Sequence, residues 1–364
     1  MFLKNRLYQE DLEYIAKLPL PWEKLNGKTV LVSGATGLIG TMLVDAIMMK
    51  NEISNYNIGI IALGRSVQKA QKRFADYFKN ENFLFVSADV NKPVYIEKNI
   101  DFLFHCASNT HPYAYSTDPI GTIMTSVLGT NNLLLMAQKK NVERIVFLST
   151  VEIYGENTMN IERFSEKDLG YIDCNTMRAG YPEGKRTGEA LCQSYICKYG
   201  MDIVIPRICR VFGPTMLESD TKALAQFINN AVEGKNITLK SEGTQYYSYC
   251  YVADVISALL YILFYGESGE AYNIADRNFD IRLKDLASML ADIAGTDVIF
   301  DLPDAIEVKG FSKATHALLD SERLCDLGWR TNGTMYEALK KTVEILKEKH
   351  SRNNTFSGCD EKKD

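Results

Sequence analysis

The chain has 364 residues, of which 46% are hydrophobic and 24% charged, and its formal net charge is -5. This length is enough for two domains or for one large α/β unit with an insertion, and the composition is that of an ordinary soluble globular protein. The acidic balance argues against general binding of nucleic acids.

Cysteine and histidine usage excludes the common metal and disulfide frameworks. The eight cysteines are scattered without a C-x-x-C pair, and the four histidines lack the spacing of metal ligands. We therefore expect no metal, reduced thiols and a cytoplasmic location. The amino terminus lacks the apolar region of a signal peptide, and no apolar run approaches the length of a membrane span, so we expect no membrane association.

Residues 1–27 precede the first predicted strand. Leu12, Ile15 and Ala16 have near-helical spacing before Pro19, which ends the pattern. The segment therefore predicts an accessory helical extension, packed on the main sheet.

Residues 28–45 predict a buried strand, a tight turn and a helix. The first glycine of Gly34-x-x-Gly37-x-x-Gly40 allows the turn, the second lets a ligand approach the backbone, and the third lets the helix pack closely on the strand. The free N–H groups and the dipole of the helix then suit a pyrophosphate. A lone glycine triplet is often only a structural turn, but the flanking strand and helix favour a dinucleotide site. The predicted cofactor-binding residues are Gly34, Thr36, Gly37, Leu38, Ile39 and Gly40.

The second predicted strand, 58–63, is followed by Arg65. An acidic residue at this position usually binds the adenosine ribose, whereas an arginine suits a 2′-phosphate. Arg65 therefore favours NADP, with NAD left open because arginine can also stack on adenine. The alternative is a solvated arginine at the start of a basic helix.

Three more strands are predicted at 83–86, 101–106 and 144–148, with an apolar helix over 120–139 between the last two. Strands that alternate with helices favour a parallel, doubly wound α/β sheet. Asp89 follows the third strand, where it can accept a hydrogen bond from adenine. Small residues end the fourth strand and would let a cofactor lie against the backbone. Further cofactor-binding candidates are Asp89, Val90, Cys106, Ala107 and Ser108.

The candidate chemistry follows the fifth strand. Thr150 lies at its carboxyl end, where ligands bind in such sheets. Tyr181 and Lys185 are four residues apart on the next predicted helix, so they project from one face. The ammonium can lower the phenol's pKa and bind a nicotinamide ribose, and a phenolate is the base that removes a hydroxyl proton during hydride transfer.

A sixth strand is predicted at 202–207, after which the regular alternation stops. The predicted organisation is a helical extension (1–27), a dinucleotide-binding domain (28–213, with 249–266 returning to it), a smaller substrate-binding lid (214–248 and 267–348) and a disordered tail (349–364).

Taken together, these motifs resemble the extended short-chain dehydrogenase/reductase superfamily, in particular its nucleotide-sugar epimerases, dehydratases and decarboxylases. The resemblance covers about 28–345, and it implies a Rossmann fold, bound NAD, a nucleotide-sugar substrate and a homodimer formed through the helices near 120–139 and 182–199. It also implies supply of precursors for cell-surface polysaccharides. The residues that carry it include the glycine turn, Asp118-Pro119, Gly129-Thr130-x-Asn132, Tyr154-Gly155, Tyr181-x-x-x-Lys185, and Arg207 with Gly213-Pro214.

Two local patterns narrow the resemblance. Thr150-x-Glu152 is similar to UDP-glucuronate decarboxylases and sugar 4,6-dehydratases, and the segment from Tyr181 to Glu189 looks especially like the decarboxylases. This implies that Thr150 binds the sugar 4-hydroxyl, Tyr181 is the base, Lys185 holds the ribose and Glu152 acts near C5. The dehydratases carry an aspartate where this chain has Val151, and valine cannot donate the proton that dehydration needs. Decarboxylation is therefore preferred, with dehydration second and C4 epimerisation third.

Two positions depart from the family pattern. Tyr247 stands where an arginine usually faces the substrate, and Arg210 replaces an asparagine. Either Arg210 supplies the missing positive charge from another wall, or it is a structural ion-pair partner. The substrate-binding candidates are Ser108, Thr150, Arg178, Arg210 and Tyr247. A rival of another class is a non-catalytic dinucleotide-binding regulator, which loss of Tyr181 or Lys185 would have favoured.

Overall fold

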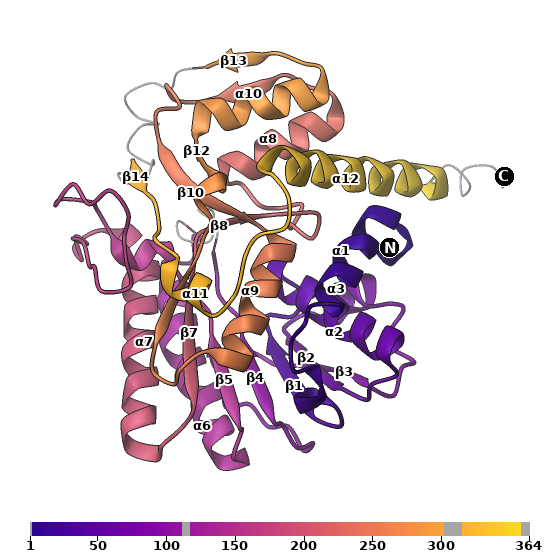
Figure 1. Cartoon of the computed structure of the whole chain (residues 1–364), viewed down its shortest axis with the longest axis vertical. Helices are drawn as coiled ribbons and strands as arrows, with labels where there is room; N and C mark the ends of the chain where they lie inside the picture. The colour runs from indigo at the N-terminus through magenta and orange to yellow at the C-terminus, as the bar shows by residue number, and fades with distance from the viewer. Residues whose placement is uncertain (1, 111–116, 302–314, 358–364) are drawn as a thin grey trace.

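The computed structural model describes residues 2–110, 117–301 and 315–357, with side chains described as far as residue 352 at the carboxyl end. A large parallel sheet with helices on both faces forms the lower part of the molecule in Figure 1, and a smaller lobe lies above it. The carboxyl ends of the sheet strands point toward this smaller lobe.

Eight strands form the large sheet in the order β11-β7-β5-β4-β1-β2-β3, with β6 also paired to β7, and every pair is parallel. The order reverses between β1 and β4, which places a ligand-binding switch point there. The predicted doubly wound sheet is confirmed, and its six predicted strands end within one residue of the observed ones. The strands are β1 (Thr29–Ser33), β2 (Gly59–Gly64), β3 (Phe83–Ser87), β4 (Phe102–His105), β5 (Arg144–Phe147), β6 (Ser149–Thr150), β7 (Ile203–Ile208) and β11 (Ala271–Ile274).

Both faces of this sheet are buried, which explains its continuous apolar runs. Val30 and Val32 belong to one core cluster, and Leu31 belongs to the cluster on the opposite face. Helices α2 (Leu38–Ser54) and α9 (Val252–Tyr265) cover the first face, and α6 (Thr130–Lys140) and α7 (Gly180–Tyr199) cover the second.

The amino-terminal extension contains α1 (Arg6–Ala16), between the 3-10 turns Phe2–Lys4 and Trp22–Leu25. We predicted this helix on the main sheet, but it packs instead on α2 and α9, which already cover that face. Tyr8 donates a hydrogen bond to the buried Asp45 of α2 at 2.6 Å. The extension is therefore a second layer over the sheet.

The segment Pro119–Lys140 is a single helical run made of α5 (Pro119–Met124), a π-turn (Thr125–Gly129) and α6. By length and composition it could cross a membrane, so our expectation that no run approaches that length was wrong. Half of its most apolar window is buried inside the protein. Since α5 and α6 pack on α7, a core helix also explains the composition.

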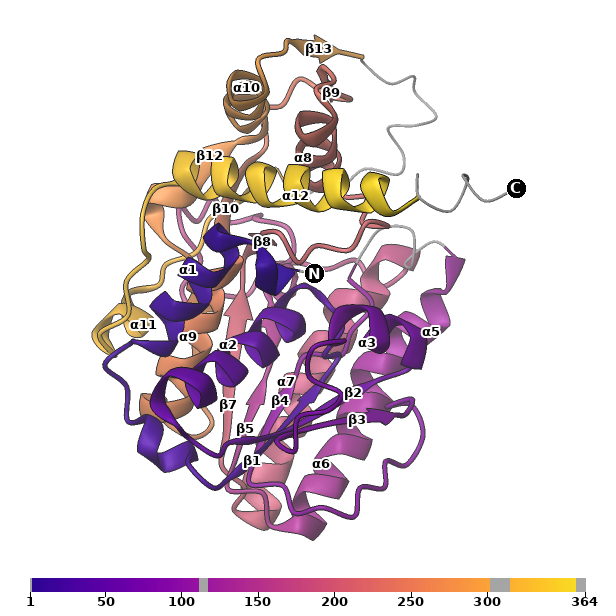
Figure 2. The same cartoon turned by 90° about the vertical axis from the view of Figure 1, so that its right-hand side faces the viewer.

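The smaller lobe contains a four-stranded sheet and a two-stranded sheet with helices against them (Figure 2). Strand β10 is central, with β8, β12 and β14 paired to it. Helix α12 packs on α8 and α10. The elements are β8 (Arg210–Phe212), α8 (Ala223–Glu233), β9 (Ile237–Leu239), β10 (Tyr246–Tyr251), β12 (Asp280–Arg282), α10 (Leu283–Ala294), β13 (Val298–Phe300), β14 (His316–Ala317) and α12 (Met335–Ser357).

The structure corrects three of the predicted boundaries. β11 lies within the predicted lid but pairs with β7 in the large sheet. β8 lies within the predicted dinucleotide domain but pairs with β10 in the smaller lobe. These strands have only four and three residues, too few for a periodicity to be read from the sequence. The predicted return of 249–266 holds for α9, which contacts β5 and β7, whereas β10 stays in the smaller lobe.

The predicted disordered tail begins too early. Helix α12 continues to Ser357, and residues 358–364 lie outside the described part of the chain. Lys349 is buried and donates a hydrogen bond to Glu218 at 2.7 Å. This contact across the fold stabilises a stretch whose polar sequence alone indicates disorder.

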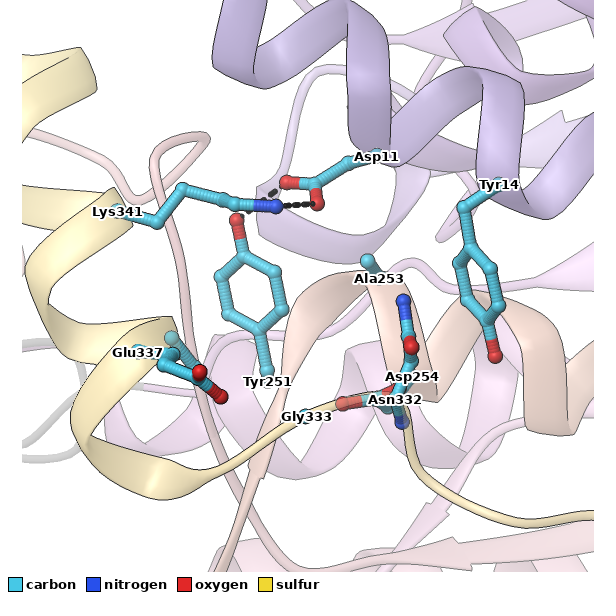
Figure 3. A pocket seen from close by; sticks show the side chains of 10 residues that line it. Asp11, Tyr14, Tyr251, Ala253, Asp254, Asn332, Gly333, Glu337 and Lys341 are labelled. Atoms are coloured by element: carbon cyan, nitrogen blue, oxygen red, sulfur yellow. Dashed lines mark hydrogen bonds and ion pairs between the residues drawn. The ribbon is translucent and has the colours of Figure 1, made fainter.

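Asp254, at the amino end of α9, lines a cavity of about 420 Å³ between α1, α9 and α12 (Figure 3). Its carboxyl group is buried, and Oδ1 accepts a hydrogen bond from the Asn332 backbone at 2.8 Å. Oδ2 has no hydrogen-bond partner among the described residues. Burial raises the pKa of Asp254 to about 7. In the same cavity Asp11 accepts hydrogen bonds from Lys341 and Tyr251.

The substitution Asp254→Asn should make stability less dependent on pH. The pKa of Asp254 is higher in the folded chain than in the unfolded chain. The stability that the protonated carboxyl group contributes is therefore complete below about pH 4 and is lost as the pH rises through about 7. Asparagine keeps an acceptor for the Asn332 amide and carries no charge. In urea unfolding, the free energy of unfolding of the variant should therefore increase relative to that of the wild type as the pH is raised from 5 to 8. Asp285→Asn, an exposed position in the first turn of α10, is the control, and an equal gain there would refute the assignment.

Candidate active site

The glycine turn packs tightly against its neighbours. A Cβ on Gly34 would lie 2.8 Å from the Ala107 Cα, and one on Gly40 would lie 2.5 Å from the Gly34 carbonyl oxygen. A Cβ on Gly37 would meet only that same oxygen, at 3.3 Å, so the outer side of the turn is open. Gly37 caps α2 without a side-chain hydrogen bond. The amino end of α2 and the open backbone fit a pyrophosphate, as predicted for this turn.

The remaining predicted residues of the turn flank this amino end. Thr36 and Ile39 are half-buried, and the Leu38 carbonyl accepts a hydrogen bond from Thr215 at 2.7 Å. Thr215 is fully buried and was missed by the sequence analysis. Only its position after Gly213-Pro214, at the entry to the smaller lobe, could have drawn attention to it.

The end of β4 is fixed by a buried hydrogen-bond chain. Ser33 Oγ lies 2.9 Å from His105 Nδ1 and accepts from the Ala107 amide at 3.2 Å. His105 Nε2 lies 3.1 Å from the Thr130 hydroxyl. Burial lowers the pKa of His105 to about 3, so the ring is neutral and structural. This chain positions the predicted cofactor-binding stretch from Cys106 to Ser108 beside the glycine turn.

Arg65, Asp89 and Val90 follow the adjacent strands β2 and β3. Arg65 is exposed, and its carbonyl accepts from Ser87 at 3.5 Å. Asp89 Oδ1 accepts from the Asn91 amide at 3.0 Å. The Val90 side chain packs on Gly129. These residues therefore lie at the edge of the sheet where the adenosine end of a dinucleotide is expected.

The predicted catalytic side chains Thr150, Glu152 and Tyr181 come together at the carboxyl ends of the strands of the large sheet. Tyr181 on α7 is 6% exposed and lies beside Thr150 at the end of β6 and Ser108 after β4. Burial and the Glu152 carboxylate raise the pKa of Tyr181, and the neighbouring hydroxyls of Thr150 and Ser108 oppose the rise. Glu152 lies in the 3-10 turn Val151–Tyr154. The geometry therefore groups a phenol, two hydroxyls and a carboxylate.

Lys185 differs from our expectation. It is buried, and Nζ donates to the Leu148 carbonyl at 2.6 Å and lies 5.0 Å from the centre of the Phe147 ring. Burial lowers the pKa of Lys185 to about 8. The prediction that this ammonium lowers the pKa of Tyr181 is wrong, because burial and Glu152 raise that pKa.

Dinucleotide affinity should fall as the pH rises through about 8. Lys185 then loses the charge with which we expect it to hold the ribose, and a hydrogen bond to a charged group contributes about 1.5–3 kcal/mol. We expect a loss of roughly tenfold or more between pH 7 and 9.5, measured by fluorescence titration. Lys185→Arg, whose guanidinium stays charged, should flatten this dependence. An unchanged slope in that variant would exclude Lys185 as the titrating group.

The predicted substrate-binding residues Arg178, Arg210 and Tyr247 also lie together. Arg178 is 3.8 Å from the Glu152 carboxylate. The Arg210 guanidinium carbon lies 3.4 Å from the centre of the Tyr247 ring, so the two groups are stacked. Burial raises the pKa of Tyr247, while Arg210 and Arg178 oppose the rise. Tyr249, which the sequence analysis missed, packs edge-on against Tyr247.

A buried ion pair supports the site from behind. Arg207 lies 2.7 Å from Glu189, which also accepts a hydrogen bond from Ser149, next to Thr150. Arg207 also donates to the Glu166 carbonyl at 2.7 Å. Arg207 and Glu189 entered the sequence analysis only as matching motif positions. Their structural role depends on contacts between distant segments, which no local pattern shows.

A family model described as the NAD dependent epimerase/dehydratase family matches residues 30–275. The chain belongs to this family. UDP-glucuronic acid decarboxylase 6 of Arabidopsis thaliana is 30% identical over 291 residues, which cover 77% of this chain and 80% of that relative. UDP-glucuronic acid decarboxylase 1 of Danio rerio is 27% identical over 360 residues, covering 97% and 82%. The predicted resemblance to this family is thus confirmed.

Solved structures confirm the fold of this family member. A dTDP-glucose 4,6-dehydratase from Streptomyces venezuelae, with NAD bound, superposes with a TM-score of 0.76 at 23% identity over 89% of this chain and 98% of that one. A UDP-glucuronic acid 4-epimerase from Bacillus cereus, in complex with UDP-glucuronic acid and NAD, gives 0.73 at 22% identity over 88% and 99%. The same architecture therefore occurs with different reactions, so the reaction must be argued from the site.

Proposed function

We propose that this chain is an enzyme that binds NAD or NADP, oxidises a nucleotide-linked sugar at C4 and decarboxylates it, with UDP-glucuronate as the preferred substrate. The grouping of Tyr181 with Thr150, Ser108 and Glu152 carries the proposal. The decarboxylase names of the relatives support the choice of reaction. Val151 is buried, and no carboxyl group occupies its position.

In the proposed reaction Thr150 holds the 4-hydroxyl and Tyr181 takes its proton. The bound dinucleotide would accept the C4 hydride and return it at the end of the reaction. Oxidation at C4 makes the C5 carboxylate part of a β-keto acid, which releases carbon dioxide. The C5 enolate that remains takes up a proton before C4 is reduced again. Burial and Glu152 raise the pKa of Tyr181 and so disfavour its phenolate form.

Product analysis by mass spectrometry tests the reaction. Purified protein is incubated with NAD or NADP and, separately, UDP-glucuronate, UDP-glucose, dTDP-glucose and CDP-glucose. Loss of carbon dioxide from UDP-glucuronate supports the proposal. Loss of water from a hexose donor would mean a 4,6-dehydratase, and exchange of stereochemistry alone would mean an epimerase. No conversion of any donor would favour a different sugar or a cofactor-binding regulator.

The choice between NAD and NADP rests on Arg65. No acidic residue ends β2, and Arg65 makes no side-chain hydrogen bond or ion pair to the described residues. An exposed guanidinium there can meet a 2′-phosphate. We expect Arg65→Ala to weaken NADP binding by roughly tenfold and to change NAD binding little, measured by titration calorimetry. Equal losses for both cofactors would instead mean that Arg65 stacks on adenine.

The same proposal includes a homodimer. Ile120, Met124, Leu128 and Leu135 are exposed along the segment Pro119–Lys140, with spacings that place them near one helical face. An apolar stripe of this kind suits a second copy of the chain. Light scattering measures the oligomeric state directly. The cytoplasmic location stays a prediction.

A further inference from the structure

We propose that the stacked pair Arg210 and Tyr247 recognises a carboxylate on the sugar of the substrate. The inference rests on the proposed function, because it takes Tyr181 as the group that acts on C4. It adds the residue that would separate a sugar acid from the corresponding neutral sugar.

The strand register brings Arg210 to the reacting end of the site. Thr150 on β6 is the direct partner of Ile208 on β7, and Arg210 follows Ile208 by two residues. In the smaller lobe Arg210 is paired with Tyr249 on β10. Arg210 therefore lies where the two sheets meet, close in the chain to the partner of Thr150.

Electrostatic contacts connect the same groups through side chains. Glu152 raises the pKa of both Tyr181 and Tyr247, so it lies near both phenols. Arg210 is stacked on Tyr247 at 3.4 Å. The arginine thus belongs to the group around the phenol that handles the C4 hydroxyl, and the carboxylate of a hexuronate is attached to C5, the adjacent carbon.

The described residues leave one positive charge of this group without an ion-pair partner. Arg178 forms an ion pair with Glu152 at 3.8 Å. Arg210 forms no ion pair with the described residues, and its buried Nη1 has no hydrogen-bond partner among them. The unpartnered Nη1 belongs to a planar guanidinium, whose N–H groups match the geometry of a carboxylate. Tyr247 is the positioning residue that holds this plane.

Binding measurements on Tyr181→Phe protein, which prevents turnover, test the inference. Calorimetry with cofactor present compares UDP-glucuronate, UDP-glucose and UDP. With Arg210 intact, we expect UDP-glucuronate to bind at least tenfold more tightly than UDP-glucose. Adding Arg210→Gln should remove this preference, with UDP-glucose and UDP unchanged within about twofold. Unchanged UDP binding also shows that the variant is folded.

Two further variants sharpen the test. Arg210→Lys should keep part of the preference, because an ammonium supplies charge without the fork. Arg282→Gln is the matched control, since Arg282 is exposed and lies 5.7 Å over Tyr246, the neighbouring tyrosine on β10. It should change none of the three affinities.

Each other outcome overturns the inference. An equal loss for all three ligands in Arg210→Gln would place Arg210 on the diphosphate, and no change would make it a structural partner of Tyr247. These results are independent of product analysis. If the protein prefers the sugar acid but epimerises it, this inference holds and the decarboxylase proposal fails. If the protein decarboxylates the sugar acid but Arg210→Gln keeps the preference, the decarboxylase proposal holds and this inference fails.

Discussion

Replacing Tyr181 with phenylalanine should reduce turnover by roughly 10²- to 10⁴-fold, the usual contribution of a positioned general base. The phenol lies beside Thr150 and Ser108, and its ring is almost fully buried, so phenylalanine fits the same space. Only the phenolic hydroxyl group, which takes the proton of the sugar 4-hydroxyl, is lost. The measurement is single-turnover release of carbon dioxide, together with cofactor affinity, which should change less than tenfold.

Tyr195→Phe is the matched control for this variant. Tyr195 is on the same helix, is 8% exposed and donates its hydroxyl proton to Asn131 at 3.0 Å, away from Thr150. Loss of the Tyr195 hydroxyl group should leave turnover nearly unchanged. If Tyr181→Phe kept more than about a tenth of wild-type turnover, Tyr181 would not be the base. If Tyr195→Phe lost as much activity, damage to α7 would explain both results.

Local patterns predicted most of the fold because they are set by short segments. The strands of the large sheet have continuous apolar runs, and the glycine turn occupies three fixed positions. Thr150, Tyr181 and Lys185 could be found because the end of a parallel strand and one helix face define where side chains gather. For the same reason, the order of the elements was enough to predict a dinucleotide fold.

Properties that depend on distant contacts could not be predicted in this way. The pKa of Tyr181 depends on burial and on Glu152, so helical spacing to Lys185 gave the wrong direction. Thr215 acts on α2 from 177 residues away. Helix α12 extends past the predicted boundary because Lys349 meets Glu218.

The substitution Gly34→Ala should both destabilise the fold and weaken dinucleotide binding by at least tenfold. Gly34 has a φ of +66°, and its Cβ would lie 2.8 Å from the Ala107 nitrogen and Cα. Backbone atoms cannot rotate away, so the turn must separate from the end of β4. We expect a loss of about 3 kcal/mol or more in the free energy of unfolding, measured by urea denaturation, with binding followed by fluorescence.

Gly200→Ala is the control that separates two effects of Gly34→Ala, the Cβ contact with Ala107 and the strain of the left-handed backbone conformation. Gly200 ends α7 with the same φ of +66°, but a Cβ there would meet nothing within 4 Å. It should cost only the left-handed conformation of alanine, about 1–2 kcal/mol, and leave cofactor affinity intact. Because the two glycines share one φ, the additional loss at Gly34 measures the contact between the turn and Ala107. Equal losses at both positions, with cofactor binding preserved, would show that this close approach does not hold the dinucleotide site together.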